Sequence, residues 1–381
     1  MNKIEQLNVY FKDQLVGKLT LHKKYFTAFE YDKKWLINGF SISPFSLPLE
    51  NKAFIPKIDP FAGLYGVFSD SLPDGWGRLL VDRLMLNNHI SPREVGNLER
   101  LAIVGLSGMG ALAYKPEKKL LTNKQQQHDL DLLAIECSNI LTTEYSEKLD
   151  DLFALGGSSG GARPKILTNI DGEEWIIKFP SQQDSKNIGR QEYEYSLCAK
   201  ECGIIMEEVK LFSSQKCDGY FGTKRFDRPA LPDGTLNKIH MISVSGLLET
   251  THRIPNLDYN TLMKLTLQLT ESYDEVEKLY RLMCFNVFAH NRDDHSKNFT
   301  FIYNERQANW ILSPAYDLTY SYSIGGEHAT MVNGNGKNPS RKEVLEVAKN
   351  IGMDQKLATT IANEVQECVK TRLNEYLESS D

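Results

Sequence analysis

The stretch that decides the fold is CFNVFAHNRDDHSKNFTFIY, residues 284–303. It begins as an apolar run, continues as nine polar residues from His290 to Asn298, and ends as a run of aromatic and β-branched residues typical of a strand. Burying so much charge between two apolar segments is costly unless the charged groups serve a purpose. An Asp can act as a general base and an Asn oxygen can bind a metal ion, so the segment is a candidate active-site loop.

The spacing of Asp293 and Asn298 narrows this interpretation. In kinase catalytic loops, an Asp that orients the substrate hydroxyl is followed five residues later by an Asn that binds the metal. The pattern is common by itself, so other parts of the chain must support it. A hairpin predicted at 299–312 delivers Asp317, in the order in which kinases supply their second metal-binding Asp. Asn298 and Asp317 would then hold Mg²⁺ through hard oxygen atoms, and Asp293 would act on the hydroxyl proton.

A second signal is the glycine- and serine-rich segment ALGGSSGGARPKIL, residues 154–167. Such a segment can turn successive backbone N–H groups toward one anion. Strands are predicted at 164–168 and 174–179, and the second carries Lys178. A glycine-rich loop between strands, with a strand-borne Lys downstream, is how kinases cover the phosphates of ATP. This predicts nucleotide contacts by Ser159, Gly160, Gly161 and Ala162. The alternative is a flexible surface loop with an edge-strand Lys.

Further candidates come from the segments that follow. A helix predicted at about 189–202 carries Glu192, which is placed to pair with Lys178 and orient it, with Glu194 as the neighbouring candidate. Phe226 would be a hinge residue with backbone groups free for an adenine edge. His295 is a candidate for orienting the catalytic loop or for touching the nucleotide.

The remaining pattern predicts the organisation of the chain. Alternating residues over 7–40, including 35–37, predict short antiparallel strands. A turn that docks Trp76 against these strands is favoured over an active-site role for Asp74 and Gly75. The polar segment 115–127 is the best domain boundary. Residues 341–379 predict one or two amphipathic helices of the large lobe, with a helix-turn-helix as the alternative.

Composition limits the class of protein. The 381 residues carry a net charge of −6, which argues against a dedicated nucleic-acid-binding protein. Six cysteines are scattered without a zinc-binding spacing, and Cys198 and Cys202 are interpreted as core residues. The sequence therefore predicts a reduced cytoplasmic protein with no structural zinc, no targeting segment and no membrane span.

These motifs together resemble the HipA-like serine/threonine kinase toxins of bacterial toxin–antitoxin modules. The resemblance spans most of the chain and is carried by five segments: 158–165, 175–178, 224–228, 293–299 and 314–318. The run 68–77 also looks like the N-terminal subdomain of that family. After the hinge the chain departs from an acidic run found in many relatives, because it has His240-Met241-Ile242-Ser243-Val244 there.

The resemblance implies roles residue by residue. Asp293 matches the catalytic Asp, Asn298 and Asp317 match the Mg²⁺ ligands, and Lys178 matches the Lys that contacts phosphate. Lys224, Phe226 and Asp227 fall in the nucleotide-binding region. Ser158, with Ser159 as the close rival, matches the loop Ser whose autophosphorylation switches the kinase off. The implied cofactors are ATP and Mg²⁺.

The resemblance also implies partners and a domain plan. The partner would be a small helix-turn-helix antitoxin, with operator DNA bound through the complex and a protein substrate such as an aminoacyl-tRNA synthetase. The expected fold is α+β: two lobes like a protein kinase, an extra N-terminal β-rich subdomain and an all-helical large lobe. The expected domains are 1–118, 128–228 with the glycine-rich loop and hinge, and 229–381 with the catalytic loop.

Two other functions share these features. A small-molecule phosphotransferase of the aminoglycoside-kinase type has the same spacing from Asp to Asn. A pseudokinase that acts as a transcriptional co-repressor needs no catalysis. Transfer of labelled phosphate distinguishes the three hypotheses.

Overall fold

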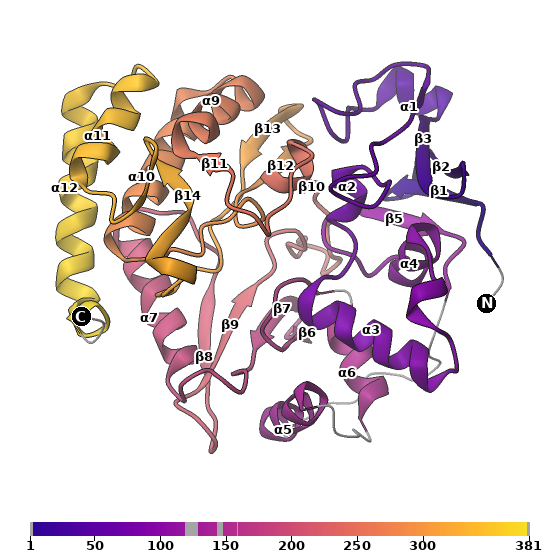
Figure 1. Ribbon diagram of the computed structural model, residues 1–381, viewed down its shortest axis with the longest axis horizontal. Coiled ribbons are helices and arrows are strands. Elements are labelled where there is room, and N and C mark those ends of the chain that lie inside the picture. The colour runs from indigo at the N-terminus through magenta and orange to yellow at the C-terminus, as the bar shows by residue number, and fades with distance from the viewer. Residues whose placement is uncertain (1–2, 119–128, 143–147, 158, 379–381) are drawn as a thin grey trace. The chain divides into compact units, whose positions relative to one another are not determined.

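A computed structural model describes residues 3–118, 129–142, 148–157 and 159–378 (Figure 1). The chain forms two compact units, and the predicted α+β class is confirmed. Unit 1 comprises Met1–Gly189, Leu211–Ile242 and Gly246–Thr250, and unit 2 comprises Arg190–Lys210, Ser243–Ser245 and Thr251–Asp381. The finer division into three domains stays a prediction. In the described part of the chain, no helix is long and apolar enough to cross a membrane.

Unit 1 begins with an antiparallel sheet whose strands have the order β4-β3-β2-β1-β5. The strands are β1 (Gln6–Phe11), β2 (Gln14–His22), β3 (Phe26–Tyr31), β4 (Ala53–Phe54) and β5 (Leu112–Lys115). Every second residue of β1 is buried, as the alternating sequence predicts. The predicted strand at 35–37 is wrong, because these residues belong to helix α1 (Lys33–Asn38), which the Asp32 side chain caps.

A second sheet of unit 1 follows the glycine-rich segment, with the order β6-β7-β9-β8. Its strands are β6 (Lys165–Ile170), β7 (Glu173–Lys178), β8 (Val209–Phe212) and β9 (Tyr220–Lys224). The turn between β6 and β7 has left-handed backbone at Asp171 and Gly172, which fits the predicted tight hairpin. The division between the units falls within β8.

Besides α1, the helices of unit 1 are α2 (Gly66–Ser69), α3 (Gly75–Asn87), the 3₁₀ turn η1 (Pro92–Glu94), α4 (Asn97–Val104), α5 (Leu130–Leu141) and α6 (Leu149–Gly156). Of these, α3, α5 and α6 bury an apolar core against β6 and β7. Trp76 of α3 packs in this core with Leu152 and Ile166. The expectation that Trp76 docks against the N-terminal strands is therefore wrong, and its partners are the elements around the glycine-rich segment.

Unit 2 is mainly helical (Figure 1). Its helices are α7 (Ile188–Glu201), α9 (Tyr259–Thr270), α10 (Tyr273–Phe288), α11 (Arg341–Asn350), α12 (Gln355–Arg372) and α13 (Asn374–Glu378). Helix α11 begins at the predicted position, where Ser340 and Glu343 form a capping box. The large lobe is not all-helical, because it contains the hairpin β12 (Thr300–Asn304) and β13 (Asn309–Leu312) that the sequence predicts.

A second group of strands in unit 2 was not predicted. The 3₁₀ turn η2 (Ile324–Gly326) leads into β14 (Glu327–Val332). Strand β14 pairs in parallel with the short β11 (Leu257–Asp258) and antiparallel with β15 (Asn335–Lys337). Two further short elements, β10 (Met241–Ser243) and α8 (Val244–Leu247), lie where the chain passes from one unit to the other. Strand β14 contacts the predicted catalytic loop, because His328 and Thr330 bond to Asp294.

Candidate active site

The predicted site residues are divided between the two units. The glycine-rich segment, Lys178 and the residues around Phe226 belong to unit 1, whereas Glu192 and the catalytic loop belong to unit 2. Each half is described by itself. The predicted pairing of Glu192 with Lys178 stays a prediction, although Glu192 is 2% exposed on α7 and its rival Glu194 is bound by Arg190 and the Tyr376 hydroxyl.

The catalytic loop begins where α10 ends at Phe288. His290 has a positive φ of 51°, which turns the chain out of the helix, and the Asn291 N–H donates to the Asn286 carbonyl oxygen at 2.9 Å. The loop then leads directly into β12. Most residues of α10 are buried, so packing fixes the position of the helix. The loop therefore starts from a fixed point.

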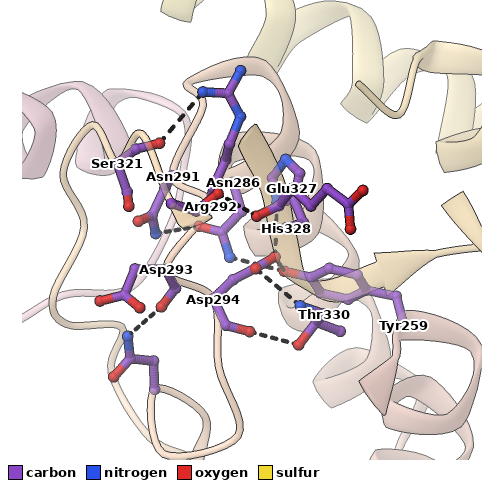
Figure 2. A network of polar contacts seen from close by, with 12 residues as sticks. Tyr259, Asn286, Asn291, Arg292, Asp293, Asp294, Ser321, Glu327, His328 and Thr330 are labelled. Atoms are coloured by element: carbon purple, nitrogen blue, oxygen red, sulfur yellow. Dashed lines mark hydrogen bonds and ion pairs between the residues drawn. The ribbon is translucent and has the colours of Figure 1, made fainter. Parts of the chain in front are cut away.

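Asp294 anchors this loop through a buried network (Figure 2). Its Oδ2 accepts a hydrogen bond from the Tyr259 hydroxyl at 2.9 Å and lies 3.0 Å from Nδ1 of His328. Its Oδ1 accepts from the Thr330 N–H at 3.1 Å. Burial and the neighbouring Asp294 carboxylate raise the pKa of Tyr259 well above its ordinary value, so its hydroxyl stays a donor. A buried carboxylate with this many donors holds the loop in one conformation.

The adjacent Asp293 lies in a different environment. Its side chain is 63% exposed, whereas the side chain of Asp294 is fully buried. The Asn298 side-chain N–H donates to the Asp293 carbonyl oxygen at 2.7 Å, and this bond orients the amide group. His295 Nε2 lies 3.9 Å from Asp293 Oδ1. The loop therefore presents one accessible carboxylate, with Asn298 and His295 beside it.

Asp317 is connected to this loop through its neighbour Tyr316. The Tyr316 hydroxyl donates to the Lys297 carbonyl oxygen at 2.7 Å and lies 2.6 Å from Oγ1 of Thr300. Asp317 itself has a positive φ of 55°, a conformation that Asp tolerates better than most residues. The hydrogen bond from Tyr316 thus holds the segment that contains Asp317 against Lys297, the residue before Asn298. The side-chain oxygen atoms of Asn298 and Asp317 are of the kind that suits Mg²⁺.

Hydrogen bonds with residues at the start of α3 hold the glycine-rich segment. Asp74 Oδ1 accepts a hydrogen bond from the Gly161 N–H at 2.5 Å, and the Gly161 carbonyl oxygen accepts from the Trp76 N–H at 2.9 Å. The Trp76 indole N–H donates to the Lys165 carbonyl oxygen at 3.0 Å. Asp74 therefore takes the backbone donor that the sequence assigns to a phosphate. The favoured interpretation of this turn as purely structural misses that contact.

The glycine-rich segment contains two serines, Ser158 and Ser159. Ser158, the expected phosphorylation site, lies outside the described residues. Ser159 is 2% exposed, and its hydroxyl donates to the Gly156 carbonyl oxygen at 2.6 Å. Gly161 and Ala162 are exposed, and Gly160 is half-buried. In this conformation the Ser159 hydroxyl is committed to the chain itself.

Two lysines lie on one face of the second sheet. Lys165 and Lys178 are direct partners in the antiparallel β6–β7 pair, so their side chains point to the same face. A Cβ on Gly161 would lie 2.7 Å from Lys165 Nζ, which places this ammonium group under the glycine-rich segment. Lys178 Nζ lies 5.5 Å from the centre of the Phe221 ring. Lys165 was missed as a site residue, and the hairpin register is the signal that identifies it.

The predicted nucleotide residues near the hinge have structural partners. Asp227 is 1% exposed and is bound by Arg225, by Arg228 and by the Gly110 N–H. Burial acts to raise its pKa, but the two guanidinium groups outweigh it and lower the pKa to about 2. Lys224 Nζ pairs with Glu173 at 2.5 Å. Asp227 thus links separate segments of unit 1, and a ribose contact would require it to leave that network. Phe226, the predicted hinge residue, is half-buried.

Comparisons with known proteins identify the family of the chain. The model of the HipA-like C-terminal domain matches residues 157–373, and the model of the HipA N-terminal domain matches residues 7–115. The Sinorhizobium fredii protein “Putative kinase Y4dM” is 28% identical over 212 residues, which are 51% of this chain and 50% of that protein. The match thus spans about half the length of this relative.

Two solved structures are similar. The Shewanella oneidensis HipA, solved as a toxin–antitoxin complex with HipB and operator DNA, aligns over 97% of this chain and 90% of its own, with a TM-score of 0.73 and 18% identity. The Helicobacter pylori proinflammatory kinase CtkA aligns over 57% of this chain and 88% of its own, with a TM-score of 0.38 and 15% identity. The first similarity shows the two-lobed α+β fold of HipA. The chain belongs to the HipA-like family.

Proposed function

We propose that this chain is an ATP- and Mg²⁺-dependent protein serine/threonine kinase that acts in the cytoplasm as the toxin of a toxin–antitoxin module. The observation that carries the proposal is the catalytic loop, in which the exposed Asp293 lies beside Asn298 and is connected through Tyr316 to Asp317. Family membership supports it, as do the kinase named in Sinorhizobium and the toxin–antitoxin complex from Shewanella.

The chemistry asked of unit 2 is positioning. In-line phosphoryl transfer needs a hydroxyl aimed at the γ-phosphorus and little covalent help from the protein. Asp293 would orient that hydroxyl and accept its proton, and an exposed carboxylate has room to meet a protein substrate. Asn298 and Asp317 would hold Mg²⁺, which neutralises negative charge on the phosphates when it is bound.

Unit 1 supplies groups that suit phosphate. Lys178 and Lys165 place two positive charges on one face of the sheet, next to the exposed backbone of Gly161 and Ala162. Lysine acts on phosphate as a point charge, so two of them add attraction without fixing one geometry. To bind phosphate through the Gly161 N–H, the loop must first give up its hydrogen bond to Asp74.

Regulation follows from the same segment. We assign autophosphorylation to Ser158 over Ser159, because the Ser159 hydroxyl is buried and donates to Gly156. A phosphate on Ser158 would add nearly two negative charges to a loop that must hold the phosphates of ATP. Phosphorylation would therefore weaken ATP binding and switch the kinase off.

The partner proposal comes from the Shewanella complex. That HipA was solved with HipB and operator DNA, so a small helix-turn-helix antitoxin is the partner to expect here. The net charge of −6 does not favour DNA binding by this chain alone, and most phosphate contacts would come from the antitoxin. The target is expected to be a protein hydroxyl, with an aminoacyl-tRNA synthetase as the first candidate.

The experiment is transfer of label from γ-³²P-ATP, with and without Mg²⁺. Wild-type protein should label itself at one Ser, and both Ser158→Ala and Asp293→Gln should abolish the label. Asp233→Asn is the control, because Asp233 lies on an exposed turn, where it accepts hydrogen bonds from Thr235.

Each result decides between functions. Label that persists in Asp293→Gln would overturn the role given to that residue. Label found on a small molecule but on no protein would replace the protein-kinase proposal with a small-molecule phosphotransferase. An absence of ATP binding would leave a non-catalytic co-repressor.

A further inference from the structure

Three cysteines that are far apart in the sequence meet in unit 2. Cys198 lies in the last turn of α7, Cys202 follows the end of that helix, and Cys368 lies near the end of α12. Their three Sγ atoms all lie within 4.8 Å of one another, and Cys198 Sγ is 3.9 Å from Cys368 Sγ. Cys198 and Cys202 are buried and Cys368 is half-buried. From the sequence, Cys198 and Cys202 are interpreted as core residues because no third ligand is near in sequence. The structure brings Cys368 to them as a third thiol.

The separations fit metal coordination better than a disulfide. A disulfide brings two sulfur atoms to about 2.05 Å and leaves a third without a role. Thiolates bound to one zinc ion at about 2.3 Å in a tetrahedral arrangement lie about 3.8 Å apart. The observed 3.9 Å between Cys198 and Cys368 already matches that spacing. Cys198 in the last turn of α7 and Cys202 just after its end, completed by Cys368 of α12, place three thiols around one point.

The surroundings suit a bound cation as well. The Arg372 guanidinium lies close enough to interact electrostatically with Cys198. One divalent ion with three thiolates carries a net charge of −1, which the neighbouring Arg372 offsets. Arg372 also pairs with Glu201 at 3.0 Å on the exposed rim, and the Glu201 carboxylate interacts electrostatically with Cys198.

We propose that Cys198, Cys202 and Cys368 bind one thiophilic divalent ion of the Zn²⁺ class and thereby join α7 to α12. Binding converts three thiols to thiolates and releases three protons for each ion bound. The fourth position is open to water or to Glu201. The site is structural, and it fixes α7, the helix that carries Glu192.

The test is a metal titration of the full chain, freed of metal and kept reduced with a phosphine. Co²⁺ is the spectroscopic probe, because thiolate ligands give it intense charge-transfer absorption and a tetrahedral site strengthens its visible bands. We expect one equivalent of Co²⁺ to bind and Zn²⁺ to displace it. The Cys368→Ala variant should bind Zn²⁺ roughly 100-fold more weakly, since it loses one of three ligands.

Cys217→Ala is the matched control, because Cys217 is also half-buried but lies outside the cluster. It should keep the cobalt spectrum and the affinity for Zn²⁺. Wild-type protein that shows no thiolate-to-cobalt band at stoichiometric metal overturns the proposal, and this result does not depend on the folding of any variant. An equal loss of binding in Cys217→Ala and Cys368→Ala would also overturn it. None of these readouts depends on kinase activity.

Discussion

The catalytic loop and the glycine-rich segment are both rich in polar or small residues, yet they are held in opposite ways. Asp294 fixes the catalytic loop through a fully buried carboxylate that three other residues contact. The glycine-rich segment is fixed by Asp74, through one hydrogen bond in an exposed position, and by close backbone packing against α3. A buried network is costly to break, whereas an exposed bond is replaced by water at little cost. The loop that carries the proposed catalytic residues is therefore preorganised, and the contact of Asp74 with the proposed nucleotide-binding segment is easier to break.

The strongest test of this comparison uses the neighbours Asp293 and Asp294. Asp294→Asn replaces an acceptor by an amide that faces donors, so the free energy of unfolding should fall by about 3 kcal/mol. Asp293→Asn should change that free energy by less than about 0.5 kcal/mol, because its side chain is exposed. The same substitution should lower phosphate transfer by about 1,000-fold.

Urea unfolding followed by circular dichroism, together with label transfer, measures both quantities. Equal stability of the two variants would show that Asp294 does not anchor the loop.

The second test concerns the packing under the glycine-rich segment. A Cβ on Gly77 would lie 2.2 Å from the Ser159 carbonyl oxygen, so Gly77→Ala must push the segment away from α3. Alanine normally stabilises a helix relative to glycine by about 1 kcal/mol. We expect a loss of about 2 kcal/mol instead, because overpacking outweighs this gain.

Gly336→Ala is the control for urea unfolding, since the nearest atom to its Cβ is 3.6 Å away. A stabilised Gly77→Ala protein would contradict the close contact.

The smallest effect is expected for Asp74. Asp74→Ala removes the acceptor of the Gly161 N–H, but this bond is exposed, so global stability should fall by less than about 1 kcal/mol. The local consequence is larger than the global one. Amide hydrogen exchange in the peptide that contains Gly161 should become about fivefold faster, and exchange in the catalytic loop should not change.

Asp233→Ala serves as the control, because it removes an exposed carboxylate elsewhere in unit 1. Faster exchange in both loops would mean that they are not held independently.

Local patterns predicted much of the fold and of the catalytic loop. The hairpin β12–β13 and the capped start of α11 depend on residues close in sequence, so spacing and turn residues identify them. Trp35 and its neighbours were misassigned because the cap by Asp32 overrides their preference for strands. Strand β14 was missed, and with it the contacts of His328 and Thr330 to Asp294.

What the sequence could not show depends on contacts between distant segments. Asp74 and Gly161 are 87 residues apart, so nothing local to either residue announces their hydrogen bond. The same holds for the approach of Cys368 to Cys198 and Cys202. Lys165 is an intermediate case, because the register of a tight hairpin places it opposite Lys178.

The docking of Trp76 has a consequence for how such genes can be divided. The two family models meet the chain as separate N- and C-terminal domains, yet Trp76 of the first completes the core beneath β6 and β7 of the second. A C-terminal half produced alone would expose part of that core to water. Its glycine-rich segment would lose the contacts to α3. The N-terminal half therefore forms part of the structure that supports the glycine-rich segment, and the boundary between the two family models is not a boundary between separate cores.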